Sequence, residues 1–428
     1  AWPAVLEQLL NMSVGLADTY IVGHLGASQL AAVGLSIQAT SIVWSLISAI
    51  GVGSTAIVAR RVGEGAHRKA NEAAQQSIIL ALVVGIIMAI LLWTFAPLFL
   101  NALGAETEVV EMGTAYLRAV SSTVFMMSIL FVGSAILRGS GDTRTPMLIM
   151  LVINVINIIV AYTLTMGVGP LPALGVLGSG IGAATARGLG GIIMLVVLIR
   201  GTRVVKLSLS GWRIVWSTVR RILQIGLPTA GEQLLMRFGQ IILAGIITGL
   251  GTLQYAAHQV AINALSVAYM PGFGFALAAT ALVGQELGAR RIDLAKRSAY
   301  EAVKMVAIIM TAMGVLVSIS ARSVMGIFVQ YADVIEIGTS VLRIAGLAMP
   351  ALGISFTFAG ALRGAGDTTA VLYITGSSIW IVRVANAIWL GSLFGLRGVW
   401  FAVAADFVVR AIALAVRFRR GRWQQVKI

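Results

Sequence analysis

Hydrophobic residues run along this chain in twelve long stretches, separated by short polar connections. Each stretch is near or above the ~20 residues that an α-helix needs to cross a bilayer. A membrane barrel would instead show strands of ~10 residues in strict alternation. The pattern therefore predicts an all-α integral membrane protein with twelve transmembrane helices. The stretches lie roughly at residues 3–22, 30–59, 73–99, 112–137, 146–166, 174–199, 219–248, 254–283, 298–325, 336–361, 370–393 and 397–416.

The composition agrees with a bilayer environment. Of 428 residues, 58% are hydrophobic and only 11% are charged, and the mean hydropathy is +0.94. A water-soluble domain carries about a quarter charged residues. Because the chain has no cysteine, it has neither a disulfide framework nor a thiolate metal site. We expect no cofactor and no bound metal.

The positions of the basic residues predict how the chain is oriented. Alternate connections hold 22 Lys and Arg residues, whereas the intervening connections hold only Arg322 and Arg397. Cytoplasmic loops carry the excess of Lys and Arg in membrane proteins. We therefore expect a multi-pass protein of the cell inner (plasma) membrane with both termini in the cytoplasm. The net charge of +15 then faces anionic lipid headgroups of the bilayer rather than nucleic acid.

An internal repeat organises the whole chain at a constant offset of 225 residues. PAVLEQLL from Pro3 returns as PTAGEQLL from Pro228, EMGTAYLR as EIGTSVLR, and LRGSGDT from Leu137 as LRGAGDT from Leu362. Chance similarity between apolar helices would hardly keep Pro, Glu, Arg, Asp and paired glycines in register. We infer that the chain consists of two copies of one six-helix unit.

The repeat predicts the domain organisation. We expect an amino-terminal six-helix lobe at 1–200, a polar cytoplasmic linker at 201–218 and a carboxyl-terminal six-helix lobe at 219–428. Because six is even, the copies have the same orientation and form parallel repeats. Such pseudo-symmetry favours a transporter with a substrate path between the lobes that opens to either side in turn.

Three regions resemble the signature regions of the multidrug and toxic compound extrusion (MATE) family. They are ADTYIVGHLGASQLAAVGL from Ala17, the doubled LRGxGDT motif, and AAHQVAINALSVAYMPGFGFALAATALVGQELGAR from Ala256. The resemblance covers essentially the entire chain and is closest to the bacterial DinF-like branch. It implies a twelve-helix antiporter that exports drugs or toxic compounds.

The LRGxGDT turns have a structural explanation of their own. Their glycines permit a tight reversal, and Asp142 is placed to cap the following helix. Arg138 would lie at the cytoplasmic side of the same turn. We interpret both copies as structural turns rather than binding motifs.

Six of the 16 acidic residues fall within the predicted spans; Glu301 and Glu336 stand in the first turn of theirs, and the four candidates are Glu7, Asp18, Glu232 and Asp406. An intramembrane carboxylate is costly, so each is a candidate for function. Glu7 and Asp18 are eleven residues apart and share a helix face with Asn11, with the carboxylates roughly 16 Å apart. The alternative is a pair of groups that only hydrogen-bond neighbouring helices.

Comparison with the second copy of the repeat distinguishes the expected roles of these acids. Glu7 corresponds to Glu232 at the repeat offset, which indicates an architectural role, whereas Asp18 corresponds to Leu243. The resemblance also aligns Asp18 with the family's carboxylate for proton or sodium coupling. We therefore expect Asp18 to couple transport to the ion, with Glu232 a weaker candidate.

The fifth and sixth stretches supply further candidates for binding substrate or ion. Asn154 and Asn157 lie about one turn apart on a helix face, either as ligands or as interhelical hydrogen-bonding groups, and Met150 suits varied apolar cargo. Where the family has an acid and a Thr, this chain has Ala161 and Ala183, which speaks against a sodium site. Arg187 would hold Asp18 charged if the two side chains faced each other.

Asp406 has a local explanation. Arg410 lies one turn along the same helix, and Arg383 lies on the preceding one. We expect a structural ion pair of Asp406 with both arginines inside the carboxyl-terminal lobe.

Together these features predict a secondary antiporter that exports amphipathic, often cationic small molecules in exchange for protons, with sodium less favoured. The chain has no GxxxxGK[ST] phosphate loop and no HExxH-type catalytic cluster, so we expect neither direct use of ATP nor an enzyme. We expect a monomer. The alternative is a lipid-linked saccharide flippase of the same superfamily, which would call for extra spans and a cationic central cavity.

Overall fold

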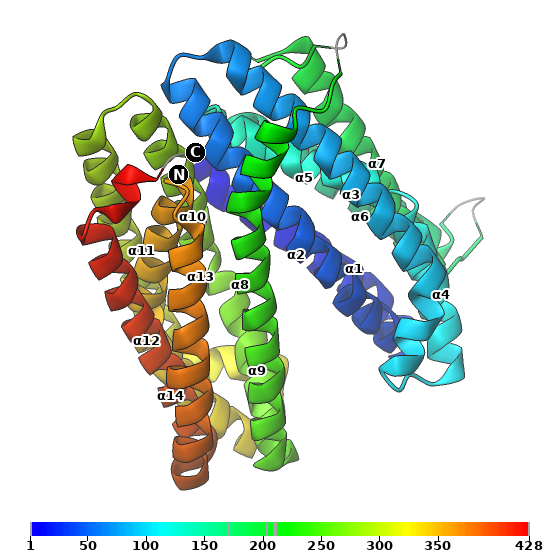
Figure 1. Cartoon of the computed structure of the whole chain (residues 1–428). Coiled ribbons are helices and arrows are strands. Elements are labelled where there is room, and N and C mark those ends of the chain that lie inside the picture. The colour runs from blue at the N-terminus through cyan, green and yellow to red at the C-terminus, as the bar shows by residue number, and fades with distance from the viewer. Residues whose placement is uncertain (1, 169–171, 203, 209–211, 427–428) are drawn as a thin grey trace. The chain divides into compact units, whose positions relative to one another are not determined.

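A computed structural model of the chain describes residues 2–168, 172–202, 204–208 and 212–426. Those ranges contain helices and no strand, which confirms the all-α fold class. The chain divides into two compact units, one of Leu6–Gly226 and one of Leu227–Ile428 with Ala1–Val5. Figure 1 labels the helices of both units.

Fourteen α-helices follow one another through the described residues. The first seven are α1 (Trp2–Gly23), α2 (Ala27–Gly63), α3 (His67–Ala102), α4 (Thr107–Ser121), α5 (Val124–Gly139), α6 (Arg144–Met166) and α7 (Val176–Arg200). The others are α8 (Trp216–Gly249), α9 (Thr252–Ala268), α10 (Met270–Gly288), α11 (Ile292–Phe328), α12 (Ala332–Gly364), α13 (Thr368–Ser377) and α14 (Ala385–Arg419). A π-helical segment, η1 (Ser378–Val384), joins α13 to α14, and a short 3₁₀ turn, η2 (Arg422–Gln425), follows α14.

These helices group into the twelve expected spans. By length and hydropathy, seven helical segments could cross a membrane, and two bent pairs, α4 with α5 at 54° and α9 with α10 at 44°, raise the number to nine. The segment Thr368–Arg419 divides at Gly395, whose φ of 60° and ψ of −142° break the helix. That division adds a tenth span. The helices α1 and α8, which are 22 and 34 residues long but do not pass that hydropathy test, bring the described residues to the twelve expected spans.

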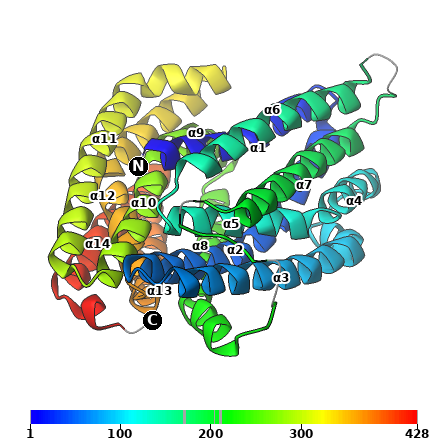
Figure 2. The ribbon, with the colours of Figure 1, turned by 90° about the horizontal axis from the view of Figure 1, so that it is seen from above.

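Glycines on α7 allow α6 to approach closely in the unit Leu6–Gly226, and Figure 2 shows the two helices side by side. A Cβ atom on Gly178 would lie 2.5 Å from the carbonyl carbon of Leu164, and one on Gly182 would lie 2.6 Å from the Cα of Ala161. Small residues four apart are a common contact surface between membrane helices. This packing fixes α6, which carries Asn157, against α7, which carries Arg187.

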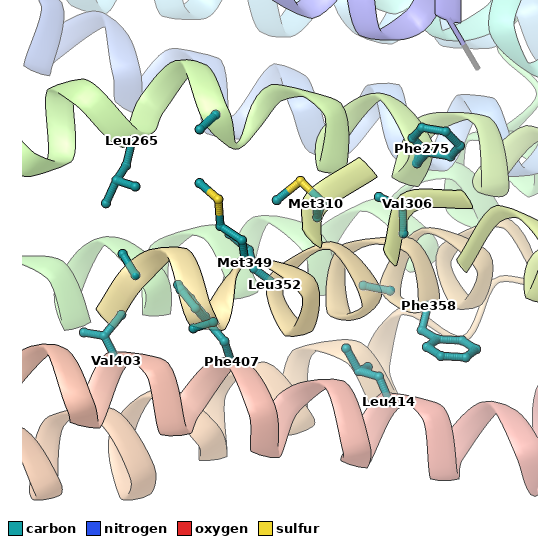
Figure 3. Close-up of a cluster of buried hydrophobic side chains, with 14 of the residues drawn as sticks. Leu265, Phe275, Val306, Met310, Met349, Leu352, Phe358, Val403, Phe407 and Leu414 are labelled. Carbon is teal, nitrogen blue, oxygen red and sulfur yellow. The ribbon is translucent and has the colours of Figure 1, made fainter. Parts of the chain in front are cut away.

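In the unit Leu227–Ile428, α12 packs against α10, α11 and α14. Figure 3 shows the buried cluster between these helices, where Met310, Met349, Leu352 and Phe407 meet. Lipid tails are as apolar as these side chains, so close van der Waals packing holds the helices together here. The cluster gives this unit a continuous interior.

The two LRGxGDT turns are present, with Gly141 at φ 95° and Gly366 at φ 86°. Asp142 caps α6 as expected, accepting hydrogen bonds from the backbone N–H of Arg144 at 3.1 Å and of Thr145 at 3.0 Å. Asp367 in the second copy instead accepts two hydrogen bonds from Arg417 of α14, at 2.8 and 3.0 Å. The same turn therefore caps a helix in one unit and binds another helix in the other.

The predicted linker 201–218 includes residues 203 and 209–211, which lie outside the described residues. Its described part is attached to α3. Gln76 donates to the carbonyl oxygen of Arg213 at 2.8 Å and accepts from the N–H of Val215 at 3.0 Å. Asn71 accepts from the N–H of Lys206 at 3.0 Å. The lobe boundaries themselves stay a prediction.

Candidate functional site

Asp18 of α1 is buried in the unit Leu6–Gly226, where it is 2% exposed. Its Oδ1 accepts a hydrogen bond from Nδ2 of Asn157 on α6, at 3.4 Å. Tyr116 of α4 and Arg187 of α7 lie near enough to interact electrostatically with the carboxylate. Side chains from three other helices therefore surround Asp18.

No salt bridge reaches Asp18 or Arg187 among the residues that the structure describes. The Oδ1 atom of Asn157, which is fully buried, has no hydrogen-bond partner. Asp18 thus has one long hydrogen bond and a more distant positive charge. A buried carboxylate in the membrane is costly while charged, so a proton bound there removes that cost.

Glu7 forms a buried ion pair with Arg138, the arginine of the first LRGxGDT turn. Arg138 Nη1 donates to Glu7 Oε1 at 2.5 Å, and the residues are 6% and 4% exposed. The other oxygen, Oε2, is buried and has no hydrogen-bond partner, and neither has Arg138 Nε. The pair therefore joins α1 to the end of α5, and one of the two carboxylate oxygens of Glu7 makes no hydrogen bond.

A small cavity lies beside this ion pair, on the face of α1 that also carries Asp18. Its volume is about 30 Å³, enough for a water-sized group but far below the 300–1,000 Å³ of drug-sized pockets. Polar and charged groups meet aromatic and aliphatic ones around it. It is lined by Glu7, Gln8, Asn11, Val14, Trp44, Met127, Leu130, Phe131, Ser134, Arg138, Met150, Ile153 and Arg187.

Asn154 connects α6 to α1. Its Oδ1 accepts a hydrogen bond from the hydroxyl of Ser13 at 2.9 Å, and its Nδ2 donates to the carbonyl oxygen of Met150 at 2.8 Å. Both ends of the amide are therefore engaged by the protein. This is the interhelical bonding that the sequence left open as an alternative to a ligand role.

The repeat-related pair in the unit Leu227–Ile428 is more completely bonded. Arg363 Nη2 donates to both oxygens of Glu232, at 2.9 and 2.7 Å. The hydroxyl of Thr375 donates to Oε1 at 3.1 Å. Both oxygens of Glu232 thus have partners, unlike those of Glu7.

Asp406 lies at the centre of a buried charged cluster in the same unit. It forms salt bridges with Arg383 of η1 and Arg410 of α14, and the hydroxyl of Ser378 donates to Oδ1. Asp406 is 0% exposed, and Phe407 lies within 5.3 Å and 6.0 Å of the two guanidinium groups. The contacts expected from the sequence are present, and they satisfy a carboxylate between two cations.

The structure brings Glu7, Asn11, Met150 and Arg187 to one cavity and places Asp18 one turn beyond its Val14 edge. It places Glu232 in the other unit. Sequence reasoning missed Arg138 as the partner of Glu7. A signal existed, because the separation of 131 residues recurs between Glu232 and Arg363, and the repeat keeps all four residues.

Comparisons with known proteins point to one family. The family model described as MatE matches residues 3–163 and 228–389. A probable multidrug resistance protein NorM of Thermotoga maritima is 31% identical over 429 residues, covering 99% of this chain and 92% of the relative. The uncharacterized transporter YisQ of Bacillus subtilis is 26% identical, with 99% and 94% covered.

Solved structures share the whole fold. A crystal structure of MATE in complex with MaD5 matches with a TM-score of 0.91 at 25% identity, covering 99% of this chain and 95% of that one. An outward-facing multidrug resistance MATE family transporter of the MOP superfamily matches with a TM-score of 0.92 at 25% identity and the same coverage. The two matched segments of the family model begin 225 residues apart, which is the offset of the internal repeat. The DinF-like branch stays a prediction.

Proposed function

The chain belongs to the MatE family of multidrug and toxic compound extrusion (MATE) transporters, and from this premise we propose that it exports amphipathic, often cationic compounds in exchange for protons. The observation that carries the exchange is the environment of Asp18. Its carboxylate is buried, has no salt bridge among the described residues and has no counterpart in the second copy, where Leu243 stands. A group that must lose and regain a proton needs such freedom from permanent partners.

A count of charges supports the exchange. Glu7, Asp18, Arg138 and Arg187 lie around or beside the small cavity, and their formal charges cancel. When Asp18 takes up a proton, a net positive charge remains. A cationic compound then binds less favourably, and this difference in affinity between two states is what coupling requires.

The side chains near Asp18 suit a proton better than sodium. Ala161 and Ala183 are fully buried and offer no side-chain oxygen, which leaves the carboxylate, the amide oxygen of Asn157 and the hydroxyl of Tyr116. Hard metal cations such as Ca²⁺ take six or more oxygen ligands, and a bound sodium ion likewise wants several. Sodium coupling is accordingly the less favoured form of the proposal.

We further propose that the lobes 1–200 and 219–428, joined by the linker 201–218, alternate in access within the inner membrane with both termini in the cytoplasm. The repeat and the placement of Lys and Arg support this arrangement.

Export from proteoliposomes tests the proposed function. Purified protein would be reconstituted, and efflux of ethidium would be followed under an imposed proton gradient or an imposed sodium gradient. We expect native transport to follow the proton gradient and Asp18→Asn to lose it, with Asp18→Glu retaining part. Transport driven by sodium alone, or an indifferent Asp18→Asn variant that inserts and folds, would contradict proton coupling at Asp18.

A further inference from the structure

A cavity of about 680 Å³ lies between α11, α12 and α14 in the unit Leu227–Ile428. Three arginines and one glutamate supply its charges, namely Arg322 of α11, Glu336 and Arg343 of α12, and Arg397 of α14. No salt bridge reaches any of these side chains among the residues that the structure describes. Three positive charges and one negative charge give the cavity a formal charge of +2.

Two of these arginines are exceptions to the distribution of charge along the chain. Arg322 and Arg397 are the only Lys or Arg residues of the connections that alternate with the basic ones. They are far apart in sequence, and the fold places both at one cavity. Basic residues are depleted on the outward side of membrane proteins. A cluster of arginines retained there calls for an explanation, which a bound anion supplies.

Contacts within the unit position Arg397 and leave part of its guanidinium free. The helix breaks at Gly395, and the N–H of the following Leu396 donates to Oε1 of Gln254 at 3.0 Å. The Nε atom of Arg397 donates to the hydroxyl oxygen of Ser340 at 3.1 Å. Its Nη1 and Nη2 atoms have no partner among the described residues. These two nitrogens are therefore available as donors to the oxygens of a phosphate.

Hydrophobic side chains below the arginines indicate that the anion belongs to a lipid. The helices α11 and α12 pack along each other and are joined by residues 329–331, so they run antiparallel, and residues farther from this connection lie deeper on both. Ile319 lies one turn deeper than Arg322 on the same face of α11. Leu347 lies one turn deeper than Arg343 on the same face of α12. Both hydrophobic side chains are largely exposed, at 78% and 82%, so acyl chains can contact them while the phosphate reaches the arginines.

We propose that this arginine pocket, lined by Arg322, Glu336, Arg343 and Arg397, binds the phosphodiester of an anionic phospholipid such as phosphatidylglycerol. Guanidinium and phosphate groups form charge-assisted hydrogen bonds, which are the strong class in proteins. A headgroup with one negative charge reduces the repulsion among the three arginines, whereas a zwitterionic headgroup brings no net charge. By the proposed orientation of the chain, this lipid belongs to the outer leaflet. The site is separate from Asp18, which lies in the other unit.

Photocrosslinking tests the lipid and its position together. The full chain would be placed in nanodiscs of phosphatidylcholine that contain a small fraction of phosphatidylglycerol or phosphatidylcholine with a diazirine in the acyl chain. After irradiation, mass spectrometry of proteolytic peptides would measure the labelling of the segments around Ile319 and Leu347. We expect phosphatidylglycerol to label these segments about tenfold more than phosphatidylcholine, the value of one charge-assisted hydrogen bond.

Two exposed arginines serve as the variants. Arg322→Gln and Arg343→Gln each remove one charge from the pocket without breaking a salt bridge, so we expect both to fold. Each should reduce the preference for phosphatidylglycerol to about threefold, and the double variant should abolish it. Lys304→Gln is the control and should keep the native ratio, because it removes an exposed charge about 27 Å from Arg322 along the same helix.

Glycerophosphoglycerol, which is the headgroup without acyl chains, distinguishes a lipid from a soluble anion. We expect about a hundredfold excess of it over the photoreactive lipid to leave the labelling unchanged, because the acyl chains add hydrophobic contact that the headgroup lacks. Displacement would show that the pocket takes a soluble phosphodiester and would overturn the assignment to a lipid. Equal labelling of the native protein by both lipids, or a preference that survives the double variant, would overturn the arginine pocket itself. Export of ethidium tests the proposed function separately from all of these results.

Discussion

The two units use one duplicated pair, a glutamate and the arginine of an LRGxGDT turn, in different ways. In the unit Leu227–Ile428, Glu232 is held by Arg363 and Thr375 through both oxygens. In the unit Leu6–Gly226, Glu7 is held by Arg138 through one oxygen, and its other oxygen is buried without a hydrogen-bond partner. The duplicated pair is therefore present in both units, but three hydrogen bonds reach the carboxylate of Glu232 and one reaches that of Glu7.

The two units also differ in how completely their buried charged side chains are paired. The buried cluster of Asp406, Arg383 and Arg410 has no counterpart among the salt bridges described in the unit Leu6–Gly226. The amino-terminal copy instead has Asp18, which no salt bridge reaches among the described residues. One unit has its buried charges paired, and the other keeps one carboxylate available.

Removing the central charge of the paired cluster should have the largest effect on stability. Asp406→Asn leaves Arg383 and Arg410 buried without their anion, and breaking such a cluster costs about 3–5 kcal/mol. Denaturant titration in detergent micelles would measure the free energy of unfolding. Asp406→Glu keeps the charge and should cost less, and equal losses for Asn and Glu would show that charge is not the cause.

The second-largest losses of stability should come from the two arginines of the duplicated pair, and the two losses should differ. Arg138→Gln should cost about 3 kcal/mol, because its side chain is 5% exposed and its loss strands a buried carboxylate. Arg363→Gln should cost about 1–2 kcal/mol, since this side chain is 19% exposed and Thr375 still donates to Glu232. The same titration compares them. A larger loss for Arg363→Gln would contradict the difference in burial.

Thr375, which donates a hydrogen bond to Glu232, should contribute less to stability than either arginine. Thr375→Val removes one hydroxyl donor to Glu232 at nearly constant volume, and we expect a loss of about 1 kcal/mol. Thr375→Ser retains the donor and is the control. If both substitutions cost the same, packing rather than the hydrogen bond explains the loss.

The smallest expected difference in stability is between variants of Arg118 and of its repeat partner Arg343. Arg118 lies 5.8 Å from the ring centroid of Trp93, and Arg118→Gln should cost about 0.5–1 kcal/mol. Its repeat partner Arg343 is exposed, with Ser318 at the position of Trp93, so Arg343→Gln should stay within about 0.5 kcal/mol. Thermal unfolding of the two variants in parallel would show the order.

Most of the fold could be predicted because it depends on span length and on the repeat. Hydropathy gave twelve stretches, but it could not show that the fourth and eighth spans bend by 54° and 44°. The bends lie where one helix ends and the next begins, between Ser121 and Val124 and between Ala268 and Met270. Helical spacing placed Asp406 with Arg410 because both lie on one helix, four residues apart.

The candidate site was less accessible to sequence reasoning. The stripe of Glu7, Asn11 and Asp18 followed from helical geometry, and the face of α1 carries it. The pairing of Glu7 with Arg138 joins residues 131 positions apart, which no local pattern encodes. Only a comparison of the two copies could have indicated it, and the missing partner of Oε2 needed the structure.

The most direct test of the central claim is proton release when substrate binds. Adding ethidium, as the probe of binding, to weakly buffered, detergent-solubilised protein with a pH-sensitive dye would count the protons set free. We expect the native protein and Glu232→Gln to release protons as the probe binds, and Asp18→Asn to bind the probe without releasing any. Equal release from native protein and Asp18→Asn would show that the exchanging carboxylate is not Asp18.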